Sequence, residues 1–246
     1  MYITGIGTIV NVITVAAGCF LGLFFKKLIS EKITDGLISA LSLATFAIGI
    51  LGVVSNGIAL SEEGLSSQHI LLMIISIVIG TAIGTIIDIE DKLDRFGAFC
   101  QKKLAGKDEN STFAEGFVTA SLVFCVGSMA VMGALDDGIR HNPDILFAKS
   151  ALDGIISIVF ASTLGIGTML SIVTLIVYQG AITLCAALIA PYLTAEVVTQ
   201  MSLIGNLLIM GIGLNFVYKP KFKVGNMLPA IFVPFVYYII RSIFKF

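Results

Sequence analysis

The sequence has no tryptophan, only two histidines and few charged residues for a chain of 246 residues. Charged residues make up 13% of the chain, whereas about a quarter of the residues in an average soluble domain are charged. The net charge of −1 argues against nucleic acid as a partner. With 57% hydrophobic residues and a mean hydropathy of +1.01, the composition excludes an ordinary soluble domain and favours a protein that has the lipid bilayer as its solvent.

Motifs for catalysis and metal binding are also lacking. The sequence has no HExxH, GxSxG or glycine-rich phosphate loop, and its four cysteines form neither a metal knuckle nor a CxxC pair. We therefore expect no disulfide, cofactor, metal site or enzymatic activity. An alternative is a membrane enzyme that uses Asp136, Asp137 and His141, because paired acids beside a histidine suit acid–base or metal chemistry. We expect these residues instead to lie at a solvated helix end.

Apolar segments of roughly twenty residues, the length that crosses about 30 Å of hydrocarbon, recur along the whole chain. The stretch from Ile155 to Leu193 contains no charged residue and is too long for one crossing, so "LGIGT" at 164–168 predicts the turn of a helical hairpin. The predicted fold is all-α, a single polytopic membrane helix bundle over 1–246. Its eight segments lie at about 3–25, 33–54, 69–87, 113–135, 145–164, 167–190, 197–217 and 226–243.

The positions of the basic residues predict the orientation, because cytoplasmic loops retain Lys and Arg. Eleven of the fifteen basic residues fall in the first, third and seventh loops. Eight crossings with both termini outside place all three loops in the cytoplasm, and the first segment is then a crossing and not a removable signal peptide. The third loop, 88–111, has apolar residues at helical spacing, which predicts an amphipathic helix on the cytoplasmic face or an extension of the third crossing.

Two stretches of the sequence occur twice. "DGLISALSLATFAIG" at 35–49 resembles "DGIISIVFASTLGIG" at 153–167, and "GTIVNVITVAAG" at 7–18 aligns with "GSMAVMGALDDG" at 127–138. The first and second segments therefore correspond to the fourth and fifth. Because the two copies are displaced by three crossings, an odd number, the second copy lies upside down in the membrane relative to the first, as in many transporters. The predicted repeats are about 3–87 and 113–190, with additional helices at 197–243; the alternative is that the copies are merely similar lipid-packed helices.

Polar residues inside the apolar segments are the candidates for a solute path, because charge at the centre of a membrane is costly and is usually paired or faces a cavity. Lys149 and Asp153 are four residues apart, which places them on one helix face and predicts an internal ion pair. Such a pair is either purely structural or holds a proton, an ion or a charged group. Asp35 is the repeat partner of Asp153. The candidates for the path are Asp153, Lys149, Asp35, Asn11, Ser39, Ser128, Ser157 and Gln179.

Small residues within the apolar segments allow either close helix packing or a break in a helix that turns backbone groups toward a solute. The candidates for this role are Gly127, Gly133, Gly165 and Gly167. Other glycine-rich faces pack within one chain or between two chains. The oligomeric state stays open, with a homodimer favoured.

Several motifs together resemble a known family. "SLVFCVGSMAVMGALDDG", "KSALDGIISIVFASTLGIG", "VYQG", "LLIMGIGLNF" and "VGNMLPA" look like successive motifs of the YqgA-like family of bacterial inner-membrane proteins, essentially from end to end. The resemblance implies a location in the bacterial cytoplasmic membrane. It implies no activity and no binding residues, and Asp136 departs from the family pattern, which has a glutamine there.

The sequence supports more than one function. The repeat and the charges in apolar segments favour a transporter or channel for an ion or a small polar solute, with its path between the repeats. The alternative is a sensor or assembly factor that acts through the cytoplasmic helix, and a membrane enzyme is the third hypothesis. The sequence does not identify the solute.

Overall fold

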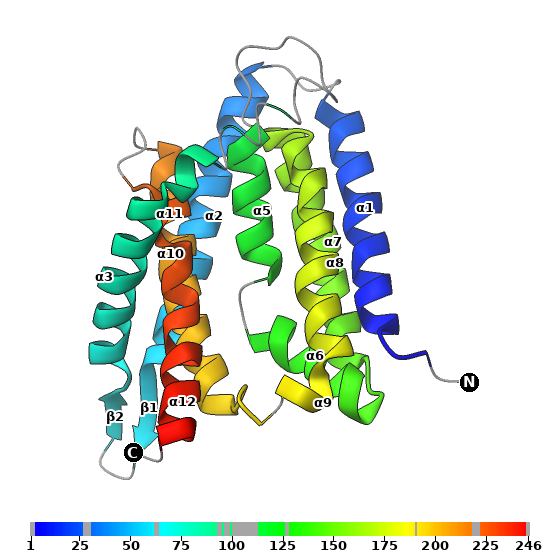
Figure 1. The fold of residues 1–246 in the computed structure, drawn as a ribbon. Coiled ribbons are helices and arrows are strands. Elements are labelled where there is room, and N and C mark those ends of the chain that lie inside the picture. The colour runs from blue at the N-terminus through cyan, green and yellow to red at the C-terminus, as the bar shows by residue number, and fades with distance from the viewer. Residues whose placement is uncertain are drawn as a thin grey trace. The chain divides into compact units, whose positions relative to one another are not determined.

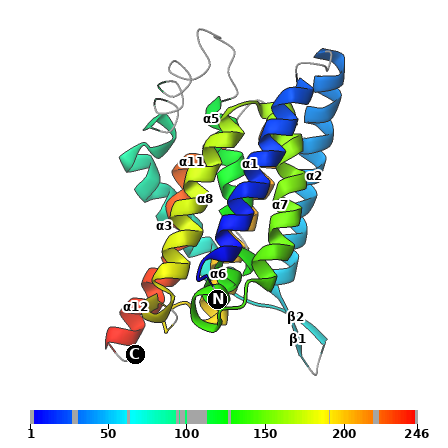
Figure 2. The same cartoon turned by 90° about the vertical axis from the view of Figure 1, so that its right-hand side faces the viewer.

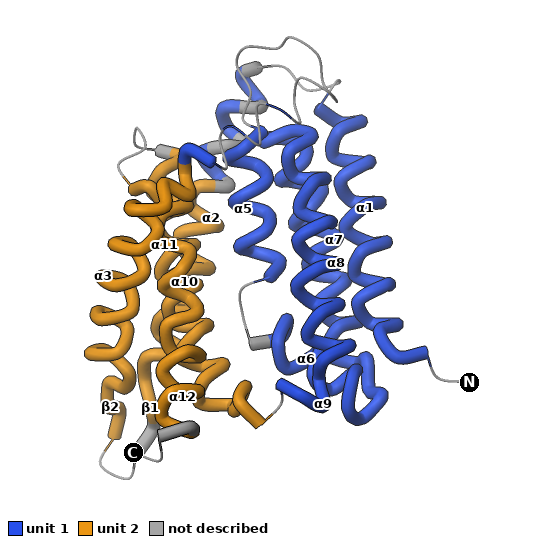
Figure 3. Tube along the Cα trace, viewed as in Figure 1, with its two compact units in different colours: residues 1–41, 91–189 blue, residues 42–90, 190–246 orange. Residues whose placement is uncertain are grey.

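The computed structural model describes residues 3–26, 31–61, 64–92, 95, 99, 113–125, 128–189, 191–217 and 222–244, and these are almost entirely helical (Figure 1). The chain divides into two compact units (Figure 3). Unit 1 comprises Met1–Leu41 and Asp91–Ile189, and unit 2 comprises Ser42–Glu90 and Ala190–Phe246. Each unit is therefore built from two separate stretches of the chain.

The elements of unit 1 are helices. They are α1 (Ile6–Lys26), the first turns of α2 (Glu31–Gly57), α5 (Phe113–Cys125), α6 (Ser128–Arg140), α7 (Asp144–Leu164), α8 (Gly167–Leu184) and the short α9 (Ala186–Ile189). Unit 2 holds the rest of α2, a hairpin of β1 (Ile58–Ser61) and β2 (Gly64–Ser67), and then α3 (Ile70–Ile87), α10 (Ala195–Val217), α11 (Val224–Met227), the 3-10 helix η1 (Leu228–Phe232) and α12 (Val233–Phe244).

Among the described residues, six helical stretches are individually long and apolar enough to cross a membrane. They are α1, α3, α7, α8, α10 and the run from α11 to α12. A seventh candidate is the pair α5 and α6, which together meet the same test but are bent by 56° where they meet. The apolar part of α2, Ser42–Gly57, is shorter. The polytopic helical fold is thus present, and the count of eight crossings stays a prediction.

Polar and apolar side chains are distributed as expected for a protein in lipid. Large apolar side chains are exposed along the helices, such as Phe20 on α1 and Ile86 on α3, whereas Asn11 and Gln179 are completely buried. In water this arrangement would expose hydrocarbon and bury amides, both at a cost. In a bilayer the apolar side chains face the hydrocarbon chains of the lipids, and the polar groups are inside the protein, where they find partners.

In unit 1, α1 packs against α7 along most of its length, and α8 lies on the other side of α1 (Figure 2). The contact with α7 is close because small residues line it. A Cβ atom at Gly18 would overlap the Ser157 hydroxyl and the carbonyl of Gly154, so the two helix backbones nearly touch there. Since Gly22 meets Ala161 one turn further along both helices, α1 and α7 run in the same direction.

The turn predicted at 164–168 joins α7 to α8. Gly165 has a φ of 81°, a left-handed conformation that a residue with a side chain rarely adopts, and its N–H donates to the carbonyl of Ala161 at 3.1 Å. Gly167 then starts α8 against the backbone of Phe113, where a Cβ atom would overlap the Phe113 carbonyl. The predicted helical hairpin is therefore present, and it also sets the position of α5.

In unit 2, α2 packs against α10, and α3 packs against α11 and η1. The hydroxyl of Ser42 donates to the carbonyl of Gly213 at 2.7 Å, and Gly52 lies against the Asn206 side chain. Gly80 of α3 contacts the backbone of Ala230. Small residues thus permit close contacts between helices in both units, as is common in membrane bundles.

The third loop begins with a break in the helix. Asp88, the residue after α3, has a φ of 54°, so α3 ends there, and the alternative of a continuous extension of the third crossing is wrong. The described residues that follow, 89–92, 95 and 99, are helical. Most of the predicted cytoplasmic helix at 88–111 lies outside the described residues. The antiparallel pair of β1 and β2, with Ile58 opposite Ser67, was not predicted.

The units cut across the predicted repeats. Helix α1 shares unit 1 with α6 and α7, whereas α2 belongs to unit 2 from Ser42 onward. The inverted repeat therefore stays a prediction.

Candidate functional site

The centre of the candidate site is an ion pair on α7. The ammonium of Lys149 contacts the carboxylate of Asp153 one helical turn further on, as their spacing predicts. Lys149 is 5% exposed and Asp153 is 4% exposed. Removing two charges from water costs several kcal/mol per ion, and their mutual attraction offsets this cost only when further hydrogen bonds complete the shell. The pair therefore needs polar neighbours.

One amide side chain from another helix contacts the pair, and a second amide from a third helix contacts the first. The side-chain nitrogen of Asn11 on α1 donates to Asp153 Oδ2 at 3.0 Å and to Gln179 Oε1 on α8 at 3.3 Å. The result is a buried polar cluster of Asn11, Lys149, Asp153 and Gln179 that joins three helices of unit 1. We call these four residues the ion-pair cluster. Its charges sum to zero, so no bound ion is needed to balance them.

The end of α5 lies near the ion-pair cluster. Helix α5 ends at Cys125, and the Cys125 side chain is within electrostatic range of both Lys149 and Asp153. Tyr178 on α8 is in turn within electrostatic range of Cys125. The last carbonyl groups of a helix have no partner within that helix and carry partial negative charge. The C-terminal end of α5 thus lies toward the buried ion pair.

Asp137 holds the beginning of α1. Its carboxylate accepts the backbone N–H of Gly5 at 3.3 Å and that of Gly7 at 3.1 Å, and the side chain is completely buried. A carboxylate at a helix N-terminus satisfies unpaired N–H groups and the partial positive charge of the helix. The expectation of a solvated helix end was therefore wrong for Asp137, because α1 covers it.

Asp136 and His141, the other members of the alternative enzyme site, have separate partners. The Asp136 carboxylate pairs with Arg140 at 3.1 Å, and a ring nitrogen of His141 lies 3.4 Å from the Thr4 hydroxyl. Within the described parts of the chain, no group of three or more His, Cys, Asp or Glu side chains is placed to hold a metal ion. The two acids thus face different surroundings and do not form a shared site.

The other predicted path residues lie apart from the ion-pair cluster or outside the described residues. Asp35 and Ser39 are exposed in the first turns of α2, where the Ser39 hydroxyl donates to the Asp35 carbonyl at 3.0 Å. Ser157 is buried in the contact between α7 and α1, and its hydroxyl donates to the Gly154 carbonyl at 2.8 Å. Gly127 and the side chain of Ser128 lie outside what the structure describes.

Of the remaining glycine candidates, Gly133 has a packing role. A Cβ atom there would lie 2.8 Å from the Leu146 side chain, so Gly133 lets α6 approach α7. Gly165 and Gly167 form the turn between α7 and α8.

Two threonines next to the ion-pair cluster were not among the predicted site residues. Thr8 lies three residues before Asn11, and Thr183 lies four residues after Gln179, and both are buried. Three- and four-residue spacing places side chains on one helix face, so a search for further polar residues on the faces of Asn11 and Gln179 would have found both.

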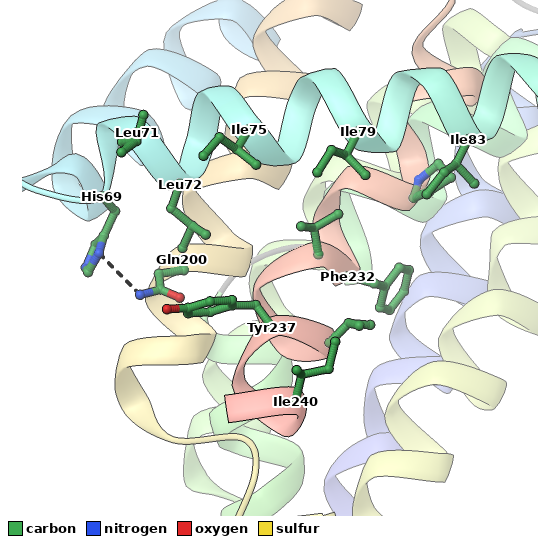
Figure 4. Close-up of a pocket in the computed structure, with 13 residues that line it drawn as sticks. His69, Leu71, Leu72, Ile75, Ile79, Ile83, Gln200, Phe232, Tyr237 and Ile240 are labelled. Carbon is green, nitrogen blue, oxygen red and sulfur yellow. Dashed lines mark hydrogen bonds between the residues drawn. The ribbon is translucent and has the colours of Figure 1, made fainter. Parts of the chain in front are cut away.

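Unit 2 contains an apolar groove of about 870 Å³ between α3 and the last helices (Figure 4). Leu72, Ile75 and Ile79 of α3 lie along one wall, and Phe232 and Tyr237 contribute to the other. A hydrogen bond of 3.3 Å between His69 and Gln200 lies at one end. The lining suits hydrocarbon and offers no charged group, so the groove is a poorer candidate for an ion or polar solute than the ion-pair cluster.

The fold and the site together define a class: a polytopic helical membrane protein with a charged cluster buried among its helices. Comparison with known proteins then identifies the family. The chain belongs to DUF554, a family of proteins of unknown function, whose profile matches residues 6–239. This result confirms the resemblance noted in the sequence.

Two relatives cover nearly the whole chain. The uncharacterized membrane protein YdfK of Bacillus subtilis (strain 168) is 33% identical over 228 residues, which are 93% of each chain. The uncharacterized protein YqgA of Escherichia coli (strain K12) is 30% identical over 229 residues, which are 92% of this chain and 93% of the relative. No solved structure matches the chain.

Proposed function

We propose that the protein is a transporter or channel for an ion or a small polar solute, and that the ion-pair cluster is its binding site. The observation that carries the proposal is the buried pair of Lys149 and Asp153, to which Asn11 of α1 donates a hydrogen bond while also donating to Gln179 of α8. Ionisable residues within membrane-spanning helices are rare and often mark solute or proton paths. No chemical conversion is part of the proposal.

The bend between α5 and α6 also supports this function. Transporters commonly bind solutes where a helix is interrupted, because the free backbone groups at the break coordinate the solute near the middle of the membrane. Cys125, at the end of α5, lies within electrostatic range of both members of the ion pair. A solute at the ion-pair cluster would therefore meet charged side chains and the end of a helix.

The neutral ion pair suggests how binding and release alternate. A cation that binds Asp153 replaces Lys149 as its partner, and an anion that binds Lys149 replaces Asp153. Either exchange keeps the buried charge balanced when a proton moves with it, because Lys149 then loses a proton as the cation binds or Asp153 gains one as the anion binds. An ion added without this proton movement would leave one charge without a counterpart. The predicted inverted repeat would let this site open to the two sides in turn.

The proposal places the protein in the bacterial cytoplasmic membrane with both termini outside. The distribution of basic residues supports this orientation, because eleven of fifteen fall in three loops that eight crossings put on one side.

Ligand-dependent thermal unfolding tests the site. The detergent-purified protein would be mixed with a panel of inorganic ions, amino acids, organic acids and nucleosides. A ligand present at a hundred times its dissociation constant stabilises a protein by about 2.7 kcal/mol. The test variant is Lys149→Met combined with Asp153→Asn, which removes both charges together and leaves no lone buried charge. The matched control is Asp144→Asn, which changes an exposed acid at the start of the same helix.

We expect at least one compound to stabilise the natural protein and the control but not the double variant. The same compound should then enter proteoliposomes that contain the natural protein. Stabilisation that persists in the double variant would remove the ion-pair cluster from the proposal. If no compound stabilises the protein, and planar bilayers containing it do not conduct H⁺, Na⁺, K⁺ or Cl⁻, the transport function is wrong.

A further inference from the structure

Four buried polar atoms in the ion-pair cluster and next to it have no hydrogen-bond partner within the described part of the chain. They belong to two side chains of α1 and two of α8: Thr8 Oγ1, Asn11 Oδ1, Gln179 Nε2 and Thr183 Oγ1. The exposed fraction of each of these four residues is 7% or less. Because nearly all buried polar groups in proteins are paired with protein or with ordered water, four such atoms close together point to water between the two helices.

The four atoms form a line that leads from the ion pair toward one end of the helices. Asn11 contacts Gln179, and α1 and α8 run in opposite directions. Thr8 lies one turn before Asn11, and Thr183 lies one turn after Gln179, so both are displaced toward the end where α1 begins. A Cβ atom at Gly5, just before α1, would lie 3.9 Å from Thr183. The line therefore reaches the N-terminal end of α1.

The length of the line fits a short file of water. Six residues separate Gly5 from Asn11, a rise of about 9 Å in a helix. Water molecules in hydrogen-bond contact are about 2.8 Å apart, so about three would span it. Each would find two or more partners, because the hydroxyls donate and accept, the Asn11 oxygen accepts, and the Gln179 nitrogen donates.

The chemistry of the line favours water over a metal cation. Hard cations are bound by oxygen atoms alone. The Gln179 nitrogen presents N–H groups and cannot be a ligand to a metal cation, which, unlike a proton passed from one water to the next, has to be coordinated where it rests. Water accepts from the N–H and donates to the oxygen atoms.

We propose that a file of water molecules between α1 and α8 carries protons between Asp153 and the membrane surface where α1 begins. This inference rests on the proposed function and deepens it, because it makes the proton an ion that the site accepts. In the step itself, a hydronium ion at the end of the file transfers one proton to the Asp153 carboxylate. The products are water and a neutral carboxylic acid.

The surroundings of Asp153 allow this step. Both of the hydrogen bonds that the structure describes for the carboxylate go to Oδ2, so Oδ1 is positioned to take the proton. The titratable groups that face it are Lys149 on its own helix and Cys125 on α5, with Tyr178 on α8 near Cys125. On α1 the facing residue is Asn11, which does not titrate. Protonation of Asp153 leaves the Lys149 ammonium without its counter-charge, ready to accept an anionic group.

Reaction of single cysteines with Ag⁺ tests the water file. In a background with alanine or serine in place of Cys19, Cys100, Cys125 and Cys185, the test variants are Thr8→Cys and Thr183→Cys. The control is Ile9→Cys, because Ile9 is adjacent to Thr8 but 48% exposed on the apolar surface of α1. Ag⁺ is added to the side where α1 begins, and the remaining thiols are measured with a fluorescent maleimide after denaturation.

We expect both test cysteines to react at least about tenfold faster than the control, because the reactive thiolate forms in water and not in lipid. Equal rates at Thr8→Cys and Ile9→Cys would overturn the water file. Infrared difference spectroscopy tests the proton step. Acidification should produce a carboxylic-acid band that is absent from the variant with Lys149→Met and Asp153→Asn. A natural protein without that band would overturn the transfer to Asp153.

The two proposals fail in different ways. Ligand-dependent stabilisation and uptake without Ag⁺ reactivity would leave the transport function in place and remove the water file. Rapid Ag⁺ reaction and an Asp153 band, without stabilisation by any compound and without conductance, would keep the water file and remove the transport function.

Discussion

The side-chain nitrogen of Asn11 lies 3.0 Å from Asp153 Oδ2, although 142 positions separate the two residues in the chain. The same nitrogen also contacts Gln179 on α8, so one amide connects three helices. This contact is possible because small residues bring α1 close to α7. The polar surroundings of the ion pair therefore depend on the close packing of α1 against α7.

The first prediction concerns the buried charge. The single change Asp153→Asn leaves the Lys149 ammonium buried without its counter-charge, and we expect it to lower the free energy of unfolding by about 3–5 kcal/mol. Lys149→Met combined with Asp153→Asn should recover most of this loss, because no lone charge remains. Denaturant unfolding in detergent measures both variants. A double variant that is no more stable than the single variant would show that the cost arises from lost packing and not from charge.

The second prediction compares two neighbouring acids. Asp137→Asn weakens two hydrogen bonds that a buried carboxylate accepts from the start of α1, and we expect a loss of about 1–3 kcal/mol. Asp136→Asn removes only an ion pair with Arg140, whose side chain is 79% exposed, and should cost less than about 1 kcal/mol. Thermal unfolding of the two variants side by side provides the comparison. Equal losses would contradict the role of Asp137 in holding α1.

The third prediction concerns the contact between α1 and α7. Gly18→Ala places a methyl group where the Ser157 hydroxyl and the Gly154 carbonyl lie, and we expect overpacking to cost about 1–3 kcal/mol. The matched control is Gly180→Ala on α8, where a Cβ atom meets no other atom within 4 Å. Because alanine favours a helix more than glycine does, the control should be as stable as the natural protein or slightly more so. If both variants are stable, the contact is looser than described.

Local features of the fold could be predicted from the sequence because they depend on residues close together in the chain. Apolar length predicted the helices, and the glycines at 165 and 167 predicted the turn between α7 and α8. The spacing of Lys149 and Asp153 predicted an ion pair, since residues four apart share a helix face. Each of these predictions needs only helix geometry and the requirement that charge in lipid be paired.

The surroundings of the ion pair depend on tertiary packing and could not be predicted in the same way. Asn11 and Gln179 were candidates individually, but the contacts of Asn11 with Asp153 and with Gln179 depend on which helices are neighbours. Asp136 and Asp137 are chemically identical and adjacent, yet a rotation of about 100° per residue along the helix buries one beneath α1 and leaves the other near the surface. The β1–β2 hairpin was missed because its short strands have no clear alternation of polar and apolar residues.

The geometry of α3 also bears on the orientation of the chain. Leu65 lies in the hairpin before α3 and is 76% exposed. At the other end of α3, the Glu90 carboxylate accepts the N–H of Gly225 at 2.6 Å, which brings the exposed Lys223 to that end. An 18-residue helix is about 27 Å long, close to the thickness of the hydrocarbon layer. If α3 crosses the membrane, Leu65 and Lys223 lie on opposite sides.

The last prediction uses these two positions. In the background without native cysteines, a membrane-impermeant thiol reagent applied to intact cells should label Leu65→Cys and not Lys223→Cys, because the basic seventh loop is expected in the cytoplasm. Permeabilised cells should show labelling of both, which controls for reactivity. The reverse pattern in intact cells would invert the predicted orientation of the termini. Labelling of both positions in intact cells would mean that α3 does not cross the membrane, and the count of eight crossings would then be wrong.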